Sequence, residues 1–136
     1  MMQLDTSQSE SICRVLLVDD NADATESLAM LLELAGFETA TATSGPQALQ
    51  VGAEQLPTVV LLDIGMPDMD GYETCRRMRA TPWGRSIPII AMTGWSEDAD
   101  HARSREAGFS AHLVKPVEPA ELLDLLKRMP GCESDT

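Results

Sequence analysis

The stretch VVLLDIGMPDMDG, residues 59–71, decides the fold. Its first four residues, 59–62, are apolar and predict a strand that is buried on both faces. The strand ends on a carboxylate, Asp63, and a turn that contains Gly65 follows before a helical pattern begins. Open α/β sheets bind their ligands at the carboxyl ends of parallel strands. Asp63 is therefore the first candidate for a functional residue.

Strand and helix patterns alternate along the whole chain. Strands are predicted at 14–18, 37–42, 59–62, 87–92 and 111–114, and helices at 22–35, 45–54, 71–79, 97–107 and 119–129. Strict alternation predicts an α/β fold, a doubly wound parallel sheet with right-handed crossovers and helices on both faces. We expect one domain at 12–130, with a flexible leader at 1–11 and a flexible tail at 131–136.

The charge of the chain argues against several classes of partner. Its 136 residues include 22 acidic and 10 basic side chains, for a formal net charge of −12. This charge opposes binding to a phosphate backbone, so we expect no nucleic acid partner. The longest apolar runs are far shorter than the roughly 20 residues that span a bilayer, and the polar, acidic N-terminus is no signal peptide. We expect no membrane contact and a cytoplasmic location.

The cysteines are three in number and far apart in the sequence. An odd number at this spacing predicts neither a disulfide framework nor a zinc site. We expect Cys13 and Cys75 to pack in the interior and Cys132 to be an exposed thiol in the tail. A reducing cytoplasm is the simplest compartment for such a chain.

Chemically useful side chains follow four of the predicted strands. The first strand is followed by Asp19 and Asp20, the third by Asp63, the fourth by Thr93 and the fifth by Lys115. Because the carboxyl ends of parallel strands share one edge of the sheet, we expect these side chains to meet there. A single acid after a strand is common in turns and caps, but this combination predicts a functional site.

Three neighbouring carboxylates need a compensating charge. Two like charges about 4 Å apart repel by about 4 kcal/mol at an effective dielectric near 20, so the acids raise one another's pKa or recruit a cation. Oxygen ligands with room for water and phosphate suit Mg²⁺. A carboxylate in such a site can attack a phosphoryl group to give an aspartyl phosphate. Lys115 would balance the transferred charge, and the Thr93 hydroxyl would hydrogen-bond a phosphoryl oxygen.

Four stretches, VLLVDDN, LLDIGMPDMDG, AMTGW and LVKP, resemble in this order the motifs of response-regulator receiver domains of two-component signalling. The resemblance covers residues 14–129. It implies a flavodoxin-like fold with strand order 2-1-3-4-5 and a cis peptide bond between Lys115 and Pro116.

The resemblance also implies roles for the acidic residues. Asp63 is then the phosphoacceptor, and Asp20 and Asp63 bind Mg²⁺ directly together with the backbone carbonyl of Gly65. Asp19 acts mainly through metal-bound water.

A switch is a further implication of the resemblance. A histidine kinase or histidine phosphotransfer protein presents phosphohistidine, Asp63 takes the phosphoryl group, and Thr93 moves inward with the loop after it. The surface formed by 97–108, 111–114 and 119–129 then changes for partner binding or phosphorelay, and it is also a candidate homodimer face. Such a chain catalyses only its own phosphorylation and dephosphorylation and is otherwise no enzyme.

Two positions depart from the usual receiver pattern. His112 stands three residues before the motif lysine, where the family usually carries Tyr or Phe. Its imidazole either follows Thr93 as a switch or is a strand residue without a switching role. Gly65 leaves one flank of the acceptor open, while Trp95, two residues after Thr93, could cover the other.

Two alternatives and one question of context stay open. A haloacid-dehalogenase-like phosphatase also uses an aspartyl phosphate, but it carries a second acid two residues after the nucleophile, where this chain has Gly65. A docking module that never accepts phosphate is the other alternative. The chain is either a stand-alone regulator or the receiver of a hybrid histidine kinase. His112 and the Lys-Pro-Val-Glu-Pro run at 115–119 resemble the residues that receivers of hybrid histidine kinases often carry at these positions.

Overall fold

The computed structural model describes residues 13–66, 70–94 and 98–132, and the side chains of 98–101 lie outside the description. Strands and helices alternate over these residues as predicted. In chain order the elements are β1 (Arg14–Val18), α2 (Ala22–Leu34), β2 (Glu38–Ala42), α3 (Gly45–Gln55), β3 (Val59–Asp63), α4 (Gly71–Arg79), β4 (Ile89–Thr93), α5 (Asp98–Ala107), β5 (Ala111–Val114) and α6 (Pro119–Lys127).

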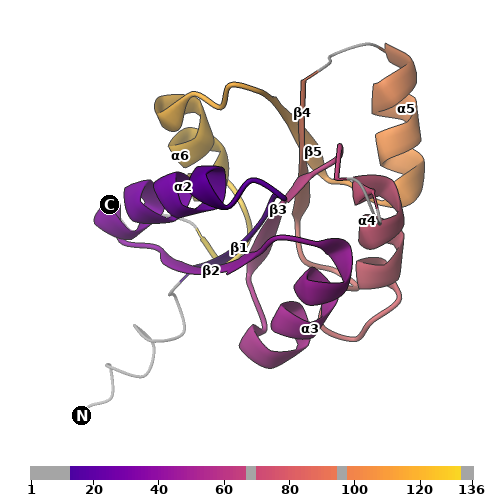
Figure 1. The fold of residues 1–136 in the computed structure, drawn as a ribbon, viewed down its shortest axis with the longest axis horizontal. Helices are drawn as coiled ribbons and strands as arrows, with labels where there is room; N and C mark the ends of the chain where they lie inside the picture. The colour runs from indigo at the N-terminus through magenta and orange to yellow at the C-terminus, as the bar shows by residue number, and fades with distance from the viewer. Residues whose placement is uncertain (1–12, 67–69, 95–97, 133–136) are drawn as a thin grey trace.

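The strands form a five-stranded sheet in the order β2-β1-β3-β4-β5, and every neighbouring pair is parallel. This confirms the expected order 2-1-3-4-5. Helices α2 and α6 cover one face of the sheet, and α3, α4 and α5 cover the other (Figure 1). Since all strands run in one direction, their carboxyl ends share one edge.

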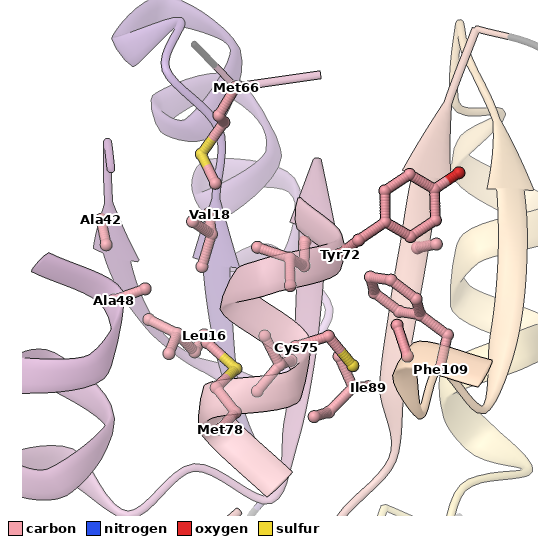
Figure 2. Packing of buried hydrophobic residues seen from close by; sticks show 14 residues of the cluster. Leu16, Val18, Ala42, Ala48, Met66, Tyr72, Cys75, Met78, Ile89 and Phe109 are labelled. Atoms are coloured by element: carbon pink, nitrogen blue, oxygen red, sulfur yellow. The ribbon is translucent and has the colours of Figure 1, made fainter. Parts of the chain in front are cut away.

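The central strands are buried on both faces, as their apolar runs predict: every residue of β3 and β4 is buried. Alternate side chains separate two apolar clusters. On one face, Cys75 and Met78 of α4 point toward Leu16 and Ile89 of the sheet (Figure 2). On the other face, the sheet packs against α2 and α6 through fully buried leucines, Leu32, Leu122 and Leu126.

Local signals explain most helix and strand boundaries. The side chain of Asn21 accepts a hydrogen bond from Ala24 N at 3.2 Å and starts α2. Strand β4 begins at Ile89 rather than at residue 87, because Pro88 has no N–H to donate. Helix α6 ends at Lys127, two residues earlier than expected, since the next two N–H groups donate to carbonyls three residues back.

The prediction for Cys132 is wrong. Its side chain is 5% exposed and forms a disulfide with Cys13, with a Cα–Cα distance of 4.8 Å. Beyond α6 the chain turns at Gly131, which has φ +85°, and this turn brings Cys132 back to the start of β1. Cys13 is buried as expected, although it is paired, and Cys75 is a buried free thiol. Of the leader at 1–11 and the tail at 131–136, only Gly131 and Cys132 lie within the described residues.

Candidate functional site

Three carboxylates gather at the carboxyl edge of the sheet. Asp19 and Asp20 follow β1, Asp63 ends β3, and one oxygen from each lies within 4.8 Å of the others. They meet because β1 and β3 are hydrogen-bonded neighbours in which Val18 pairs with Leu62. Asp19 and Asp63 are buried, whereas Asp20 is exposed. The structure thus brings together the acids that the strand ends predicted.

Lys115 reaches the acids from the other side. Its Nζ donates to Asp19 Oδ2 at 3.0 Å and lies 3.3 Å from Asp63 Oδ1. The lysine directly follows β5, and its backbone N–H donates to the Thr93 carbonyl at 2.8 Å. The peptide bond to Pro116 is cis, as the resemblance implied. One ammonium therefore bridges two of the three carboxylates.

The site as a whole carries excess negative charge. Burial raises the pKa of Asp63 and the charge of Asp19 adds to this, while the Gly65 N–H and Lys115 act in the opposite direction without cancelling the rise. For Lys115, burial lowers the pKa, but the hydrogen bond to Asp19 and the two carboxylate charges more than offset it, so its pKa is raised. Among the described residues, three acids face the Lys115 ammonium, and a divalent metal ion fits this donor set.

The turn after β3 is held by two glycines. Gly65 N–H donates to Asp63 Oδ1 at 3.2 Å, and the space beside Gly65 is open, since a Cβ there would meet only Asp63 Oδ1 at 3.9 Å. At Gly71, a Cβ would lie 2.6 Å from Ile64 Cα and 2.7 Å from the Asp63 carbonyl oxygen. Gly71 N–H also donates to the Ile64 carbonyl at 3.0 Å. Gly71 thus lets the chain close tightly behind Asp63.

Two supporting residues were missed by the sequence reasoning. The Asn21 N–H donates to Asp19 Oδ1 at 3.0 Å, so Asn21 orients this carboxylate in addition to capping α2. For Gly71 the sequence predicts only the start of a helix. The signal for Asn21 was its position directly after the acid pair, and the signal for Gly71 was a glycine at the first position of a helix.

The predicted switch residues occupy the two strands beside the site. Thr93 ends β4 and is 5% exposed. His112 lies in β5 opposite Ala91 and is half-buried. Its neighbour Leu113 belongs to the cluster under α2 and α6, so His112 faces the side of α3, α4 and α5. Trp95 lies outside the described residues, and its cover of the site stays a prediction.

Helix α5 contacts the beginning of α4 through one arginine. The guanidinium carbon of Arg103 lies 4.0 Å from the centre of the Tyr72 ring, and its Nη2 lies 3.8 Å from Asp70 Oδ2. Asp70 caps α4 by accepting from Glu73 N at 2.9 Å. The position of α5 is therefore linked to the turn that supports Asp63.

An open groove of about 340 Å³ runs from the acids toward α2. It has acidic, basic and apolar walls, and its lining residues are Asp19, Asn21, Ala24, Leu28, Met92, Lys115, Pro116 and Val117. A segment of another molecule can thus approach the carboxylates from this side.

A doubly wound α/β domain with clustered acids and a lysine at its carboxyl edge defines a receiver-type signalling module. The chain belongs to the response regulator receiver domain family, whose sequence model matches residues 15–127. It is a receiver domain of two-component signalling, a class of signalling modules rather than of classical enzymes.

Named relatives agree with this assignment. Response regulator PleD of Caulobacter vibrioides is 37% identical over 80% of this chain, and the match covers 24% of PleD. The structure of chemotaxis protein CheY4 from Vibrio cholerae matches with a TM-score of 0.84 and 30% identity, over 87% of this chain and 98% of CheY4. The receiver domain of sensor histidine kinase PA1611 from Pseudomonas aeruginosa, solved with magnesium in its active-site cleft, matches with a TM-score of 0.79 and 32% identity. The match covers 87% of this chain and 97% of the PA1611 receiver domain.

The chain thus spans about a quarter of the length of PleD. Among the helices of the described residues, none is long and apolar enough to cross a membrane.

Proposed function

We propose that Asp63 is the phosphoacceptor of this receiver. The observation that carries the proposal is the position of its carboxylate, which is buried at a strand end, where Gly65 N–H and Lys115 Nζ both contact Oδ1. These contacts hold the carboxylate in one orientation. Asp19 and Asp20 lie beside it but belong to a different strand end, and Asp19 is already engaged by Asn21 and Lys115.

Phosphoryl transfer at this site forms one bond and breaks another. A carboxylate oxygen of Asp63 attacks the phosphorus of a phosphohistidine, an O–P bond forms, and the P–N bond to the histidine breaks with its electron pair remaining on the imidazole. The Lys115 ammonium balances charge on the transferred group, and the Thr93 hydroxyl donates a hydrogen bond to a phosphoryl oxygen. The chain then catalyses only its own phosphorylation and dephosphorylation.

The same residues fit Mg²⁺ as the cofactor. Asp20, Asp63 and the Gly65 carbonyl would hold the ion directly, and Asp19 would hold it mainly through water. Support comes from the oxygen-only donor set within 4.8 Å and from the magnesium in the related PA1611 receiver. When bound, the ion supplies positive charge against the three acids and the phosphoryl oxygens.

The phosphodonor in this proposal is a histidine kinase or a histidine phosphotransfer protein. Its phosphohistidine would approach through the open groove between α2 and the segment after β5. The formal net charge of −12 supports a protein partner over a nucleic acid. We further propose a cytoplasmic domain at 12–130 without membrane contact.

The output in this proposal is a change of the surface formed by α5, β5 and α6, which is also the candidate homodimer face. Phosphorylation draws Thr93 inward, His112 follows on the same side of the sheet, and α5 leaves its contact with Tyr72. A full inversion from mostly inactive to mostly active requires the phosphoryl group to favour the active state by about 5.5 kcal/mol.

Incubation with labelled acetyl phosphate and Mg²⁺ tests the proposal. The wild type is expected to incorporate acid-stable but base-labile label at Asp63, and Asp63→Asn is expected to incorporate none. Asp23→Asn removes an exposed acid from the first turn of α2 and is the matched control. Labelling of Asp63→Asn at the wild-type rate would refute the assignment. Multiple turnover on a generic phosphate ester would revive the phosphatase alternative, which Gly65 does not support.

A further inference from the structure

The C-terminal turn lies at the opposite end of the sheet from the acids. Cys132 in this turn and Cys13 at the start of β1 form a disulfide with a Cα–Cα distance of 4.8 Å, within the range of about 4.4–6.8 Å that disulfides need. Both side chains are 5% exposed and belong to the apolar cluster under α2 and α6. The pair joins positions separated by 119 residues.

Backbone pairing fixes the position of Cys13. Its carbonyl accepts from Glu38 N at 3.0 Å, which ties it to β2. The next residue, Arg14, exchanges hydrogen bonds with Thr58, whose N–H donates to the Arg14 carbonyl at 2.8 Å and whose Oγ1 accepts from Arg14 N at 3.1 Å. Cys13 is therefore held in the sheet whatever the state of its sulfur.

Packing also fixes the position of Cys132. Gly131 has φ +85°, and a Cβ there would lie 2.7 Å from Thr58 Cγ2, so the turn lies directly against the segment before β3. The Cys132 N–H donates to the Met129 carbonyl at 3.0 Å. The cluster that contains both cysteines also includes Leu126. These contacts place the two sulfurs together without requiring a bond between them.

We propose that Cys13 and Cys132 are a reversible redox staple that locks the end of α6 onto the sheet. The oxidant is a low-molecular-weight disulfide of the glutathione class. The Cys132 thiolate attacks one sulfur of the oxidant, which forms a mixed disulfide and releases one oxidant thiolate. The Cys13 thiolate then attacks the Cys132 sulfur of this mixed disulfide and releases the second oxidant thiolate. Two cysteine thiols are oxidised, one oxidant disulfide is reduced to two thiols, and the two protons pass to the released thiolates.

The staple acts on stability rather than on the chemistry of Asp63. Closing a loop of 119 residues restricts the unfolded chain strongly. Six residues of extended chain, about 20 Å, separate Cys13 from Asp19, so the acids are remote from the bond. Oxidation therefore holds α6, one element of the proposed output face, while phosphoryl acceptance continues.

Equilibration of the full chain in glutathione buffers of graded potential tests the proposal. Oxidised wild type is expected to lose two hydrogens by mass, to melt about 10 °C above the reduced wild type, and to exchange the amide hydrogens of α6 more slowly. Its labelling by acetyl phosphate is expected to be the same in both states. Because this comparison uses only the wild-type chain, it does not depend on whether a variant folds.

Variants identify the pair. Cys132→Ser is expected to lose the redox response of Tm and of α6 exchange, whereas Cys75→Ser, which alters the other buried cysteine, is expected to keep it. Equal melting of oxidised and reduced wild type would overturn the proposal. A response that persists in Cys132→Ser would also overturn it, because another thiol would then be responsible.

Discussion

Lys115 Nζ lies 3.0 Å from Asp19 Oδ2, although the two residues are 96 positions apart in the chain. Asp19 is the most deeply buried of the three acids, and its other oxygen accepts a hydrogen bond from the backbone N–H of Asn21 at 3.0 Å. The ammonium thus compensates a carboxylate that has little contact with water. This pair links the edge strand β5 to the centre of the site.

Replacing this lysine is expected to destabilise the metal-free protein. In Lys115→Met, the buried carboxyl group of Asp19 loses its ammonium partner, which costs about 1–3 kcal/mol for a buried hydrogen-bonded acceptor. Mg²⁺ is expected to recover part of this loss because it restores positive charge beside the acids. Chemical denaturation in EDTA and in excess Mg²⁺ measures both effects.

Lys127→Met is the matched control, since Lys127 is exposed in the last turn of α6. It is expected to change the unfolding free energy by less than about 0.5 kcal/mol in either buffer. Equal stability of Lys115→Met and wild type in EDTA would show that Asp19 needs no cation.

Removing the charge of Asp63 is expected to stabilise the metal-free protein at pH 7. Burial and the neighbouring Asp19 raise the pKa of Asp63 in the folded state, so the folded chain binds this proton more tightly than the unfolded chain. The free energy of unfolding therefore falls as pH rises from the ordinary carboxyl pKa, near 3.8, through the raised pKa of the folded state. Above the raised pKa, the ionised Asp63 carboxylate destabilises the fold to its full extent. Asp63→Asn lacks this destabilising charge and is expected to melt a few degrees above the wild type in EDTA.

The pH dependence of the difference tests the cause. The gap in Tm between Asp63→Asn and wild type is expected to close as pH is lowered through the raised pKa. Asp124→Asn, an exposed acid on α6, serves as the control and is expected to show no such gap. A gap of the same size at all pH values would point to packing rather than to ionisation.

Most of the site was predictable because it depends on strand ends. Asp19, Asp20 and Asp63 each follow an apolar run, and parallel strands bring such positions to one edge whatever the details of packing. Lys115 and Thr93 were predicted for the same reason. The alternation of strand and helix patterns also decides the order of the elements, so the fold could be predicted without knowledge of individual contacts.

The features that were missed depend on contacts between distant segments. The pairing of Cys13 with Cys132 follows from a turn after α6 that packs on Thr58, and cysteine spacing contains no information about that turn. Arg79 looks like any charged residue on a helical surface, yet it hydrogen-bonds carbonyls of two loops. Such contacts are decided by loop geometry rather than by periodicity.

The tight turn behind Asp63 provides a third prediction. Gly71→Ala is expected to cost about 1–3 kcal/mol, because its Cβ would overlap Ile64 Cα and the Asp63 carbonyl oxygen, both of which are backbone atoms. If Asp63 is the proposed phosphoacceptor, Gly71→Ala should also slow its labelling by acetyl phosphate, since the backbone of Asp63 must shift. Denaturant unfolding and labelling rates measure the two effects.

Gly65→Ala is the control for this turn. Its Cβ would enter open space, with Asp63 Oδ1 as the nearest atom at 3.9 Å, and the backbone carbonyl is kept. We expect a stability change below about 0.5 kcal/mol. A loss in Gly65→Ala as large as that in Gly71→Ala would contradict the steric argument.

Arg79 is expected to stabilise the end of α4 and both loops beside it. Its Nε and Nη2 donate to the Gly108 carbonyl at 3.0 and 2.7 Å, and its Nη1 donates to the Ile87 carbonyl at 2.6 Å. Arg79→Met keeps much of the apolar stem but leaves these carbonyls without a charged donor, at a cost of about 2–3 kcal/mol. Denaturant unfolding measures the loss.

Arg77→Met is the control for Arg79, because Arg77 pairs with Glu73 at the exposed surface of the same helix. We expect little change in its unfolding free energy, since surface ion pairs are weak. A loss in Arg79→Met as small as that in Arg77→Met would mean that water satisfies the loop carbonyls as well as the guanidinium does.

Cys75 is expected to resist alkylation in the folded protein. It is fully buried in the cluster of Figure 2, and this burial raises its pKa to about 11 even though Arg79 and Arg76 act in the opposite direction. At pH 8 about one molecule in a thousand then carries the reactive thiolate, and the sulfur is shielded as well. Iodoacetamide followed by mass spectrometry of the peptide that carries Cys75 is expected to show labelling only at the rate of opening, and rapid labelling once guanidinium unfolds the chain. Labelling of the native protein as fast as of the unfolded protein would mean that α4 opens readily from the sheet, and the close packing of Cys75 and Met78 on Leu16 and Ile89 would then contribute little to the stability of the domain.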